Sequence, residues 1–416
     1  MNKVQEANEN SSSLSGEVRR GALSFDSIRP FNDDEVKPAI ESLLHDRQFS
    51  RILKGIAPFL PLGISRGMLK LATLGIHSTL GFQVRFMKPV VNHVLRKCST
   101  GHTFQHDTIA SGPERYTFIS NHRDIVLDSA ILDVMLFDAK FPTTCEIAIG
   151  DNLLIYPWIR TLVRLNKAFI VRRNISRREL FESSMLMSRY MHHVIQEKHE
   201  NIWIAQREGR AKDSSDQTQV SLLKMLAMSD ADHPLERIKS LNIVPLSISY
   251  EYDPCDYLKA KEFQQKRDDS GWKKSKQDDL VNMKTGIFGQ KGHVHYQTAR
   301  PVNEWIDELK GLDKTEFFAE LARRIDHEIH ANYRLFPGNY VAADLLSGTP
   351  THTRHYSHKE KQAFERYIKE RIALVDLPNR DDDFLRERLL TMYSNPVINN
   401  ERAKNPTPLT LPEGGE

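Results

Sequence analysis

Cysteines and metal-ligand patterns are scarce in this chain of 416 residues. It has three cysteines, Cys98, Cys145 and Cys255, which lie far apart and show no CxxC spacing. Such a set excludes a disulfide framework and a zinc ribbon, and it fits a reducing compartment. We therefore expect no metal site.

No stretch of the sequence is apolar enough to cross a membrane. The longest uncharged apolar run, residues 71–84, is shorter than the ~20 residues that a spanning helix needs. Residues 1–22 are polar and lack the apolar core of a signal peptide. We expect no signal peptide, no transmembrane helix and a cytoplasmic location.

Acidic side chains are missing from one long segment. Residues 47–106 hold no aspartate or glutamate but nine lysines or arginines, interleaved with leucine, isoleucine and phenylalanine. Basic and apolar residues at helical spacing indicate a helix lying on an anionic bilayer. An ordinary helical region with one basic, solvated face would have the same pattern.

Net charge argues against a nucleic-acid partner. The formal charge of the whole chain is only +3, which excludes a strongly basic packaging protein. The basic segments also lack the interleaved aromatic residues of an RNP-type RNA-binding surface. We expect an anionic membrane surface as a partner, and no nucleic acid.

The sequence changes in character near Pro113, where short strand-like runs begin to alternate with helical stretches. The expected strands are residues 116–120, 145–149, 168–172, 201–205, 241–250 and 293–298. The expected helices are residues 124–138, 152–165, 175–198, 220–228 and 303–332. This alternation predicts an α/β fold with a largely parallel sheet and helices on both faces.

Composition divides the chain into five regions. They are a disordered N-terminus (1–22), a basic helical region (23–110), an α/β domain (111–335), a C-terminal helical extension (336–403) and a tail (404–416). Residues 254–290 interrupt the α/β pattern with many charged residues. We expect them to form an exposed, mobile insertion, either a solvated loop or a cover over a site.

A histidine follows the first strand of the expected sheet, in the sequence SNHRDIVLD of residues 120–128. The end of a strand before a helix is where α/β sheets place their ligands. Asp124 and Asp128 are both close enough to orient the His122 imidazole, which could then take a proton from a hydroxyl. The HRD triplet also matches the catalytic loop of protein kinases, but the asparagine expected five residues later is Ser129.

Three further blocks lie in or directly after expected strands. They are AFIVRR (168–173), REGRAK (207–212) and IVPLSI (243–248). The first two bring arginines to the sheet edge that holds His122, and arginine forks are suited to phosphate. Gly209 would let the backbone approach a ligand closely.

Taken in order, these blocks resemble the glycerophospholipid acyltransferase family, which includes lysophosphatidic acid and glycerol-3-phosphate acyltransferases. The matches to its motifs are Asn121-His122 with a following aspartate (NHx4D), Phe169 to Arg172 (FIxR), Glu208 to Arg210 (EGTR) and Val244 to Leu246 (the proline-containing motif). The resemblance covers about residues 113–300.

Two departures from the family pattern affect the site. The NHx4D spacing places Leu127 where the aspartate is expected, and Asp128 follows one residue later. We favour Asp128 over Asp124 as the partner of His122, provided that His122 lies in the loop before the helix. The threonine of EGTR is also missing, so Arg210 follows Gly209 directly.

The resemblance implies an O-acyltransferase that moves a fatty acyl group from an acyl thioester to a hydroxyl of lysophosphatidic acid or a related lysophospholipid. His122 would be the general base and Asp128 would orient it. Arg172 and Arg210 would bind the acceptor phosphate, and Glu208 and Gly209 would shape the pocket. Acyl-CoA or acyl carrier protein would be the co-substrate, with no other cofactor.

Alternatives remain for the acceptor and for the class of function. A glycerol-3-phosphate acyltransferase, or an enzyme acting on a non-phosphate amphiphile, would carry the same motifs. A non-catalytic membrane-binding protein could keep the fold without the chemistry. In each case the basic segment would hold the protein on the inner face of a membrane as a peripheral protein.

Overall fold

The computed structural model describes residues 24–50, 67, 69–173 and 175–405. The predicted disordered N-terminus and nearly all of the predicted tail lie outside these residues, as does part of the basic segment, residues 51–66.

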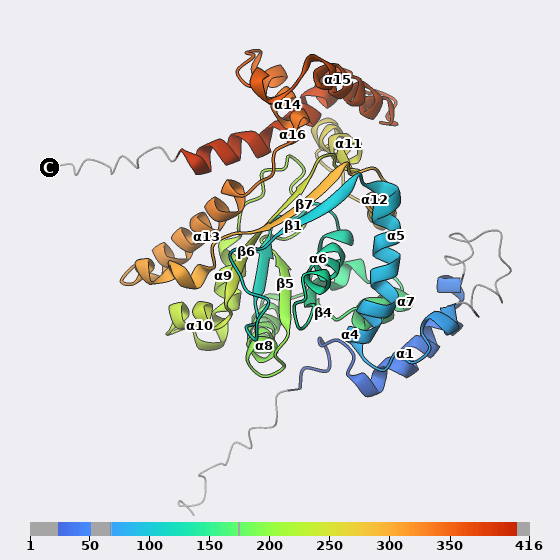
Figure 1. The fold of residues 1–416 in the computed structure, drawn as a ribbon, viewed down its shortest axis with the longest axis vertical. Helices are drawn as coiled ribbons and strands as arrows, with labels where there is room; N and C mark the ends of the chain where they lie inside the picture. The colour runs from blue at the N-terminus through green and yellow to red at the C-terminus, as the bar shows by residue number, and fades with distance from the viewer. Residues whose placement is uncertain (1–23, 51–66, 68, 174, 406–416) are drawn as a thin grey trace, which may run out of the picture.

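A seven-stranded sheet forms the centre of the molecule (Figure 1), with the strand order β1-β7-β6-β2-β5-β3-β4. Its strands are β1 (Gly101–Gln105), β2 (Thr117–Ser120), β3 (Cys145–Gly150), β4 (Ala168–Val171), β5 (Asn201–Ala205), β6 (Ile243–Tyr250) and β7 (His293–Thr298). Only the β6–β7 pair is antiparallel. The predicted, largely parallel sheet is confirmed, and β1 is an edge strand that the sequence did not predict.

Helices cover both faces of this sheet, as predicted. One face packs against α8 (Arg177–Gln196), α9 (Val220–Leu226), α10 (Pro234–Ser240) and α13 (Lys314–Ala331). The other face packs against α5 (Lys88–Cys98) and α6 (Leu127–Asp138). Helix α7 (Pro157–Leu165) joins β3 to β4.

The central strand β2 shows why both faces must be covered. Its four residues, TFIS, are all fully buried, which is typical of a strand inside a parallel sheet. Successive side chains point to opposite faces, so Phe118 joins the core beneath α6 while Ile119 joins the core beneath α8. The carboxyl end of β2 is therefore held rigidly between two hydrophobic layers.

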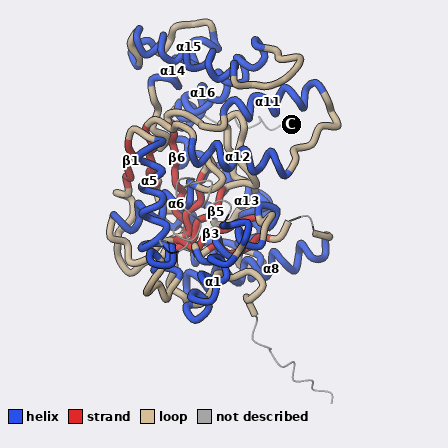
Figure 2. The backbone as a smooth tube through the Cα atoms, turned by 90° about the vertical axis from the view of Figure 1, so that its right-hand side faces the viewer, coloured by secondary structure: helices blue, strands red, loops and turns tan. Residues whose placement is uncertain are grey.

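Helical regions precede and follow the sheet. The N-terminal region contains α1 (Asp33–His45), α4 (Thr79–Phe82) and a π-helix, η1 (Gln83–Met87), which continues into α5. The C-terminal extension contains α14 (Pro337–Ser347), α15 (His358–Ala373) and α16 (Asp382–Lys404). Figures 1 and 2 show this extension stacked at one end of the molecule, around its own hydrophobic core.

Residues 254–290, which we expected to form an exposed, mobile insertion, are helical over most of their length. They form two helices, α11 (Asp256–Asp268) and α12 (Lys276–Phe288), and α11 packs against α16. The buried charges of this segment are paired, since Lys259 Nζ binds Asp253 Oδ2 at 2.6 Å and Lys212 pairs with Glu262. A charged sequence can form a helix that packs against the fold when the charges that become buried find partners.

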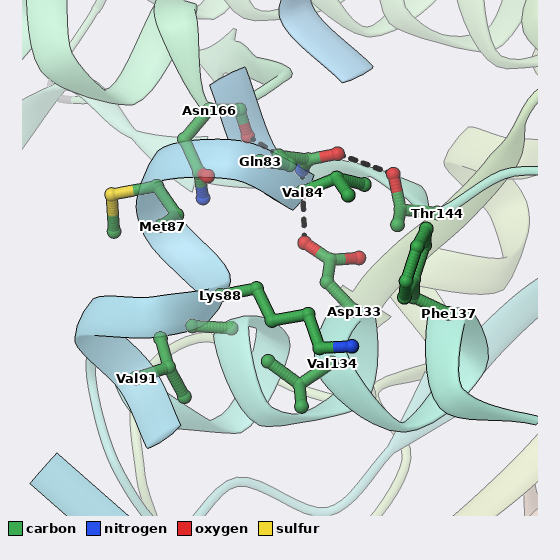
Figure 3. Close-up of a pocket in the computed structure, with 11 residues that line it drawn as sticks. Gln83, Val84, Met87, Lys88, Val91, Asp133, Val134, Phe137, Thr144 and Asn166 are labelled. Atoms are coloured by element: carbon green, nitrogen blue, oxygen red, sulfur yellow. Dashed lines mark hydrogen bonds between the residues drawn. The ribbon is translucent and has the colours of Figure 1, made fainter. Parts of the chain in front are cut away.

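A network of buried hydrogen bonds joins the N-terminal helices to the sheet, at the edge of a small cavity (Figure 3). Gln83, in η1, donates from Nε2 to Asp133 Oδ2 at 2.9 Å and to the Asn166 carbonyl at 3.1 Å. Its Oε1 accepts a hydrogen bond from Thr144. One buried side chain thus joins η1 to α6, to the end of α7 and to the start of β3.

Within the part of the chain that the structure describes, no helix is both long and apolar enough to span a bilayer.

Candidate active site

The loop between β2 and α6 is anchored by its first residue, Asn121. Its Nδ2 donates to the Ile248 carbonyl and its Oδ1 accepts from the Ile248 amide, both at 2.8 Å. Asn121 is fully buried. This reciprocal pair ties the carboxyl end of β2 to the neighbouring strand β6 and fixes where the next residue, His122, begins.

His122 and Asp128 are joined by a hydrogen bond of 2.8 Å between Nδ1 and Oδ2. Asp128 lies in the first turn of α6 and is fully buried, and the His122 side chain is 12% exposed. The histidine precedes the helix, so the extra residue relative to the NHx4D spacing is absorbed in the loop.

The Asp128 carboxylate has three other donors. Oδ2 accepts from the amides of Arg123 and Asp124 at 2.6 and 3.0 Å, and Oδ1 accepts from Tyr250 Oη at 3.0 Å. Because an ionised carboxylate only accepts hydrogen bonds, the proton between it and the imidazole belongs to His122 Nδ1. Nε2 of the neutral ring is then left as an acceptor, the form that a general base requires.

Asp124, the alternative partner of His122, instead accepts hydrogen bonds from backbone amides. Its Oδ1 accepts hydrogen bonds from the amides of Val126 and Leu127, both at 2.8 Å, at the start of α6. Burial, together with the neighbouring Asp128, raises the pKa of Asp124 above its usual value. The structure therefore brings Asp128, not Asp124, into contact with His122.

A tryptophan ring packs against His122. The rings of His122 and Trp203 meet edge to face with centroids 5.6 Å apart, and Trp203 Nε1 donates to Ser120 Oγ at 3.1 Å. Trp203 comes from β5, the strand on the other side of β2 from β6. The Trp203 ring thus restricts the imidazole on the side of β5.

Arg172 lies farther from His122 than its motif suggests. It directly follows β4 and is exposed. Strand β4 is three positions from β2 in the sheet, a lateral separation of about 14 Å at the usual strand spacing. Its neighbour Arg173 forms an ion pair with Glu208 at 2.7 Å, which links the FIxR-like block to the EGR block.

Arg210 is placed closer to His122, because it follows β5, which pairs directly with β2. Its Nη2 donates to Asn282 Oδ1 in α12 at 3.1 Å, while its buried Nη1 has no partner among the described residues. The preceding residue, Gly209, has a φ of +67°, a left-handed conformation in which a side chain is strained. The glycine turns the chain so that Arg210 points back into the protein.

The sequence did not predict that Tyr250 belongs to the site, nor the ion pair between Arg123 and Asp216. Tyr250 is the last residue of β6, and its hydroxyl reaches Asp128 because β6 lies beside β2. The sequence placed a strand end there but carried no sign of which strands are neighbours. Across the described residues, no group of three or more His, Cys, Asp or Glu side chains could hold a metal ion.

Comparisons with known proteins agree with the motifs over part of the chain. Residues 102–247 match the family model described as Acyltransferase, which confirms the resemblance over that stretch. Among solved structures, the chain is similar to the 1-acyl-sn-glycerophosphate (LPA) acyltransferase PlsC from Thermotoga maritima. The two share 12% sequence identity with a TM-score of 0.34, over 72% of this chain and 99% of that one. No curated protein matches the chain.

Proposed function

Residues 102–247 match the acyltransferase family, and we propose that the protein is an acyltransferase of phospholipid synthesis. It would transfer a fatty acyl group from an acyl thioester to a hydroxyl of lysophosphatidic acid or a related lysophospholipid. The observation that carries the proposal is the hydrogen bond between His122 and the buried Asp128. It supports a base with its free nitrogen, Nε2, at the edge of the sheet where α/β proteins bind ligands.

The proposed reaction needs no covalent enzyme intermediate. His122 Nε2 takes the proton of the acceptor hydroxyl as its oxygen attacks the thioester carbonyl carbon. The tetrahedral intermediate collapses, the carbon–sulfur bond breaks and the thiol leaves with the proton returned by the imidazolium. Asp128 keeps the proton on Nδ1 and stabilises the positive charge that the ring carries in between.

The proposed acceptor contacts follow the family motifs. Arg210, with one buried guanidinium nitrogen left without a partner in the described residues, is the better-supported phosphate ligand. Arg172 would meet the same molecule only if the acceptor extended along the sheet edge. Glu208 would orient Arg173, with which it forms an ion pair, and Gly209 would shape the pocket. The donor would be acyl-CoA or acyl carrier protein.

The deciding experiment measures thiol release by the purified protein from a panel of acyl-CoAs. Lysophosphatidic acid and glycerol-3-phosphate serve as separate acceptors, and His122→Ala is assayed beside the wild type. We expect release that depends on lysophosphatidic acid and is lost in a folded His122→Ala protein. Dependence on glycerol-3-phosphate instead would identify the alternative acceptor.

Two results would count against the proposal. Thiol release that survives in His122→Ala would remove His122 as the base. No release with either acceptor, from acyl-CoA and then from acyl carrier protein, would favour a non-catalytic membrane-binding protein on the same fold.

A further inference from the structure

A second cavity lies between the carboxyl edge of the sheet and the C-terminal extension. It is narrow and partly open to solvent, and it is lined from the sheet side by Asn121, Arg123 and Tyr250. Its opposite wall comes from the chain after α13 and from α14 and α16, including Tyr333 and Arg334. None of the acyltransferase motifs accounts for this second wall.

Two polar groups at this cavity are buried without a partner. Arg123 and Tyr333 are each 8% exposed, and neither Arg123 Nε nor Tyr333 Oη makes a hydrogen bond within the described residues. Buried donors are almost always satisfied, since leaving one unpaired costs free energy. Two such donors on facing walls of one cavity therefore point to a missing acceptor.

The charge around the cavity favours an anion as that acceptor. Arg123 already neutralises Asp216, and Lys259 neutralises Asp253, the carboxylate that lines the cavity. Arg334 forms no ion pair with any described residue and is exposed, so one positive charge is left where the cavity meets solvent.

Residues with hydroxyl groups add to the possible donors at this cavity. Besides Arg123, Tyr333 and Arg334, it is lined by Ser214 and Ser249. Ser249 Oγ accepts from the Arg334 amide at 3.1 Å, so its own proton is free to be donated. Ser214 is held in a left-handed conformation with φ of 59°, which is uncommon for a residue other than glycine.

We propose that this cavity binds a phosphate group, held by Arg123, Tyr333 and Arg334. Three phosphate oxygens can accept from donors on different walls, whereas a carboxylate offers two oxygens in one plane. The site would lie beside the His122–Asp128 pair, because Tyr250 lines the cavity and also donates to Asp128. The C-terminal extension would then complete a ligand site that the sheet alone leaves open.

The first test is thermal unfolding of the full chain in inorganic phosphate, against chloride at equal ionic strength. A ligand that binds only the folded state raises Tm in a saturable way, and we expect that for the wild type. Tyr333→Phe and Arg334→Gln should weaken the apparent Kd about tenfold, the loss expected for one charge-assisted or buried hydrogen bond. Tyr333→Phe removes a hydroxyl that has no partner, so the unliganded protein should keep its stability.

Matched controls separate this site from general charge effects and from catalysis. Arg300→Gln changes another exposed arginine, which directly follows β7. Because β7 is antiparallel to β6, Arg300 lies at the edge of the sheet opposite to the end of β6. It should bind phosphate like the wild type. His122→Ala, which removes the proposed base, should also keep phosphate binding, so a failure of the proposed function would not hide this site.

Two further probes distinguish the source of the phosphate. They are glycerol-3-phosphate, and phosphatidylcholine vesicles with and without phosphatidic acid. Binding of the soluble phosphates that depends on Arg334 assigns the site to a free phosphate ester. Binding confined to vesicles with phosphatidic acid, with the same dependence, assigns it to a lipid headgroup. The proposal is overturned if none of the three probes binds or stabilises the protein more than the chloride control does. It is also overturned if both variants bind phosphate with the Kd of the wild type.

Discussion

At the scale of single residues, the site depends on how the carboxylate of Asp128 is satisfied. A fully buried carboxylate is costly unless donors surround it, and here they are His122, two backbone amides and Tyr250. These donors come from two segments, the β2–α6 loop and the end of β6, and together they hold the carboxylate in one orientation. It therefore fixes both the tautomer and the direction of the His122 ring.

Replacing the two neighbouring aspartates separately tests this assignment. Asp128→Asn presents an amide nitrogen to donors that need an acceptor, so we expect acyl transfer to fall by a factor of roughly 10³–10⁴. Asp124→Asn keeps the oxygen that accepts from Val126 and Leu127, and its rate should stay within tenfold of the wild type. The measurement is kcat with acyl-CoA and lysophosphatidic acid. Equal losses in the two folded variants would refute the assignment.

At the scale of elements, the hydrogen bond between Gln83 and Asp133 joins the N-terminal helices to the sheet. Asp133 accepts from Gln83 Nε2 and from the Cys145 amide at 2.8 Å. Burial raises the pKa of Asp133 from 3.8 to about 7, although the Cys145 amide and Lys167 oppose the shift. The carboxyl group at the joint between these elements thus titrates near neutral pH.

This pKa predicts how stability depends on pH. The folded-state pKa lies above the unfolded value, so between pH 3.8 and about 7 the folded state holds the proton more tightly. Stability should then fall as pH rises through this window, by on the order of a few kcal/mol, and level off above it. Urea unfolding of the wild type at about pH 5 and about pH 8 should show the fall.

Asp133→Asn supplies the control, because it has no carboxyl group to ionise. Whatever its absolute stability, it should lack this component of the pH slope. The same slope in both proteins would mean that another group is responsible.

At the scale of the whole molecule, part of the basic segment 47–106 presents apolar side chains to solvent. Leu71 is 72% exposed and Leu74 is 67% exposed, and the exposed Lys70 lies beside them. Exposed leucines next to a cation fit the surface of an anionic bilayer. We propose that this surface, Lys70 to Leu74, is where the protein meets the membrane as a peripheral protein.

Vesicle binding tests that surface directly. With vesicles that contain phosphatidylglycerol, the double variant Leu71→Ser, Leu74→Ser should bind at least tenfold more weakly, because each leucine contributes ~1.5–3 kcal/mol when fully buried and proportionally less when partly buried. Leu374→Ser, at an equally apolar but distant site that is 53% exposed in the C-terminal extension, should bind like the wild type. Added salt should weaken binding of all three proteins. An equal loss in the Leu374 variant would refute the location.

Much of the fold could be read from local patterns, and the two failures have different causes. Six of the strands were predicted from short apolar runs. His122 and Arg210 were placed after the correct strands, and Arg172 at the end of the correct strand. Strand β1, with the sequence GHTFQ, was missed because its side chains are mostly exposed at the sheet edge. Helices α11 and α12 were read as an insertion because their sequence is rich in charge, and a buried charge such as Glu262 meets its partner Lys212 only in the folded chain.

The sequence by itself determined which residues stand at strand ends, since apolar periodicity and the four motifs are local properties of the chain. Only the tertiary structure decided which of these residues meet. Strand order, which no local pattern encodes, places Tyr250 beside Asp128 and leaves Arg172 three strands away. The choice of Asp128 over Asp124 likewise depended on where α6 begins, and the cavity at Arg123 exists only because a distant helical extension closes it.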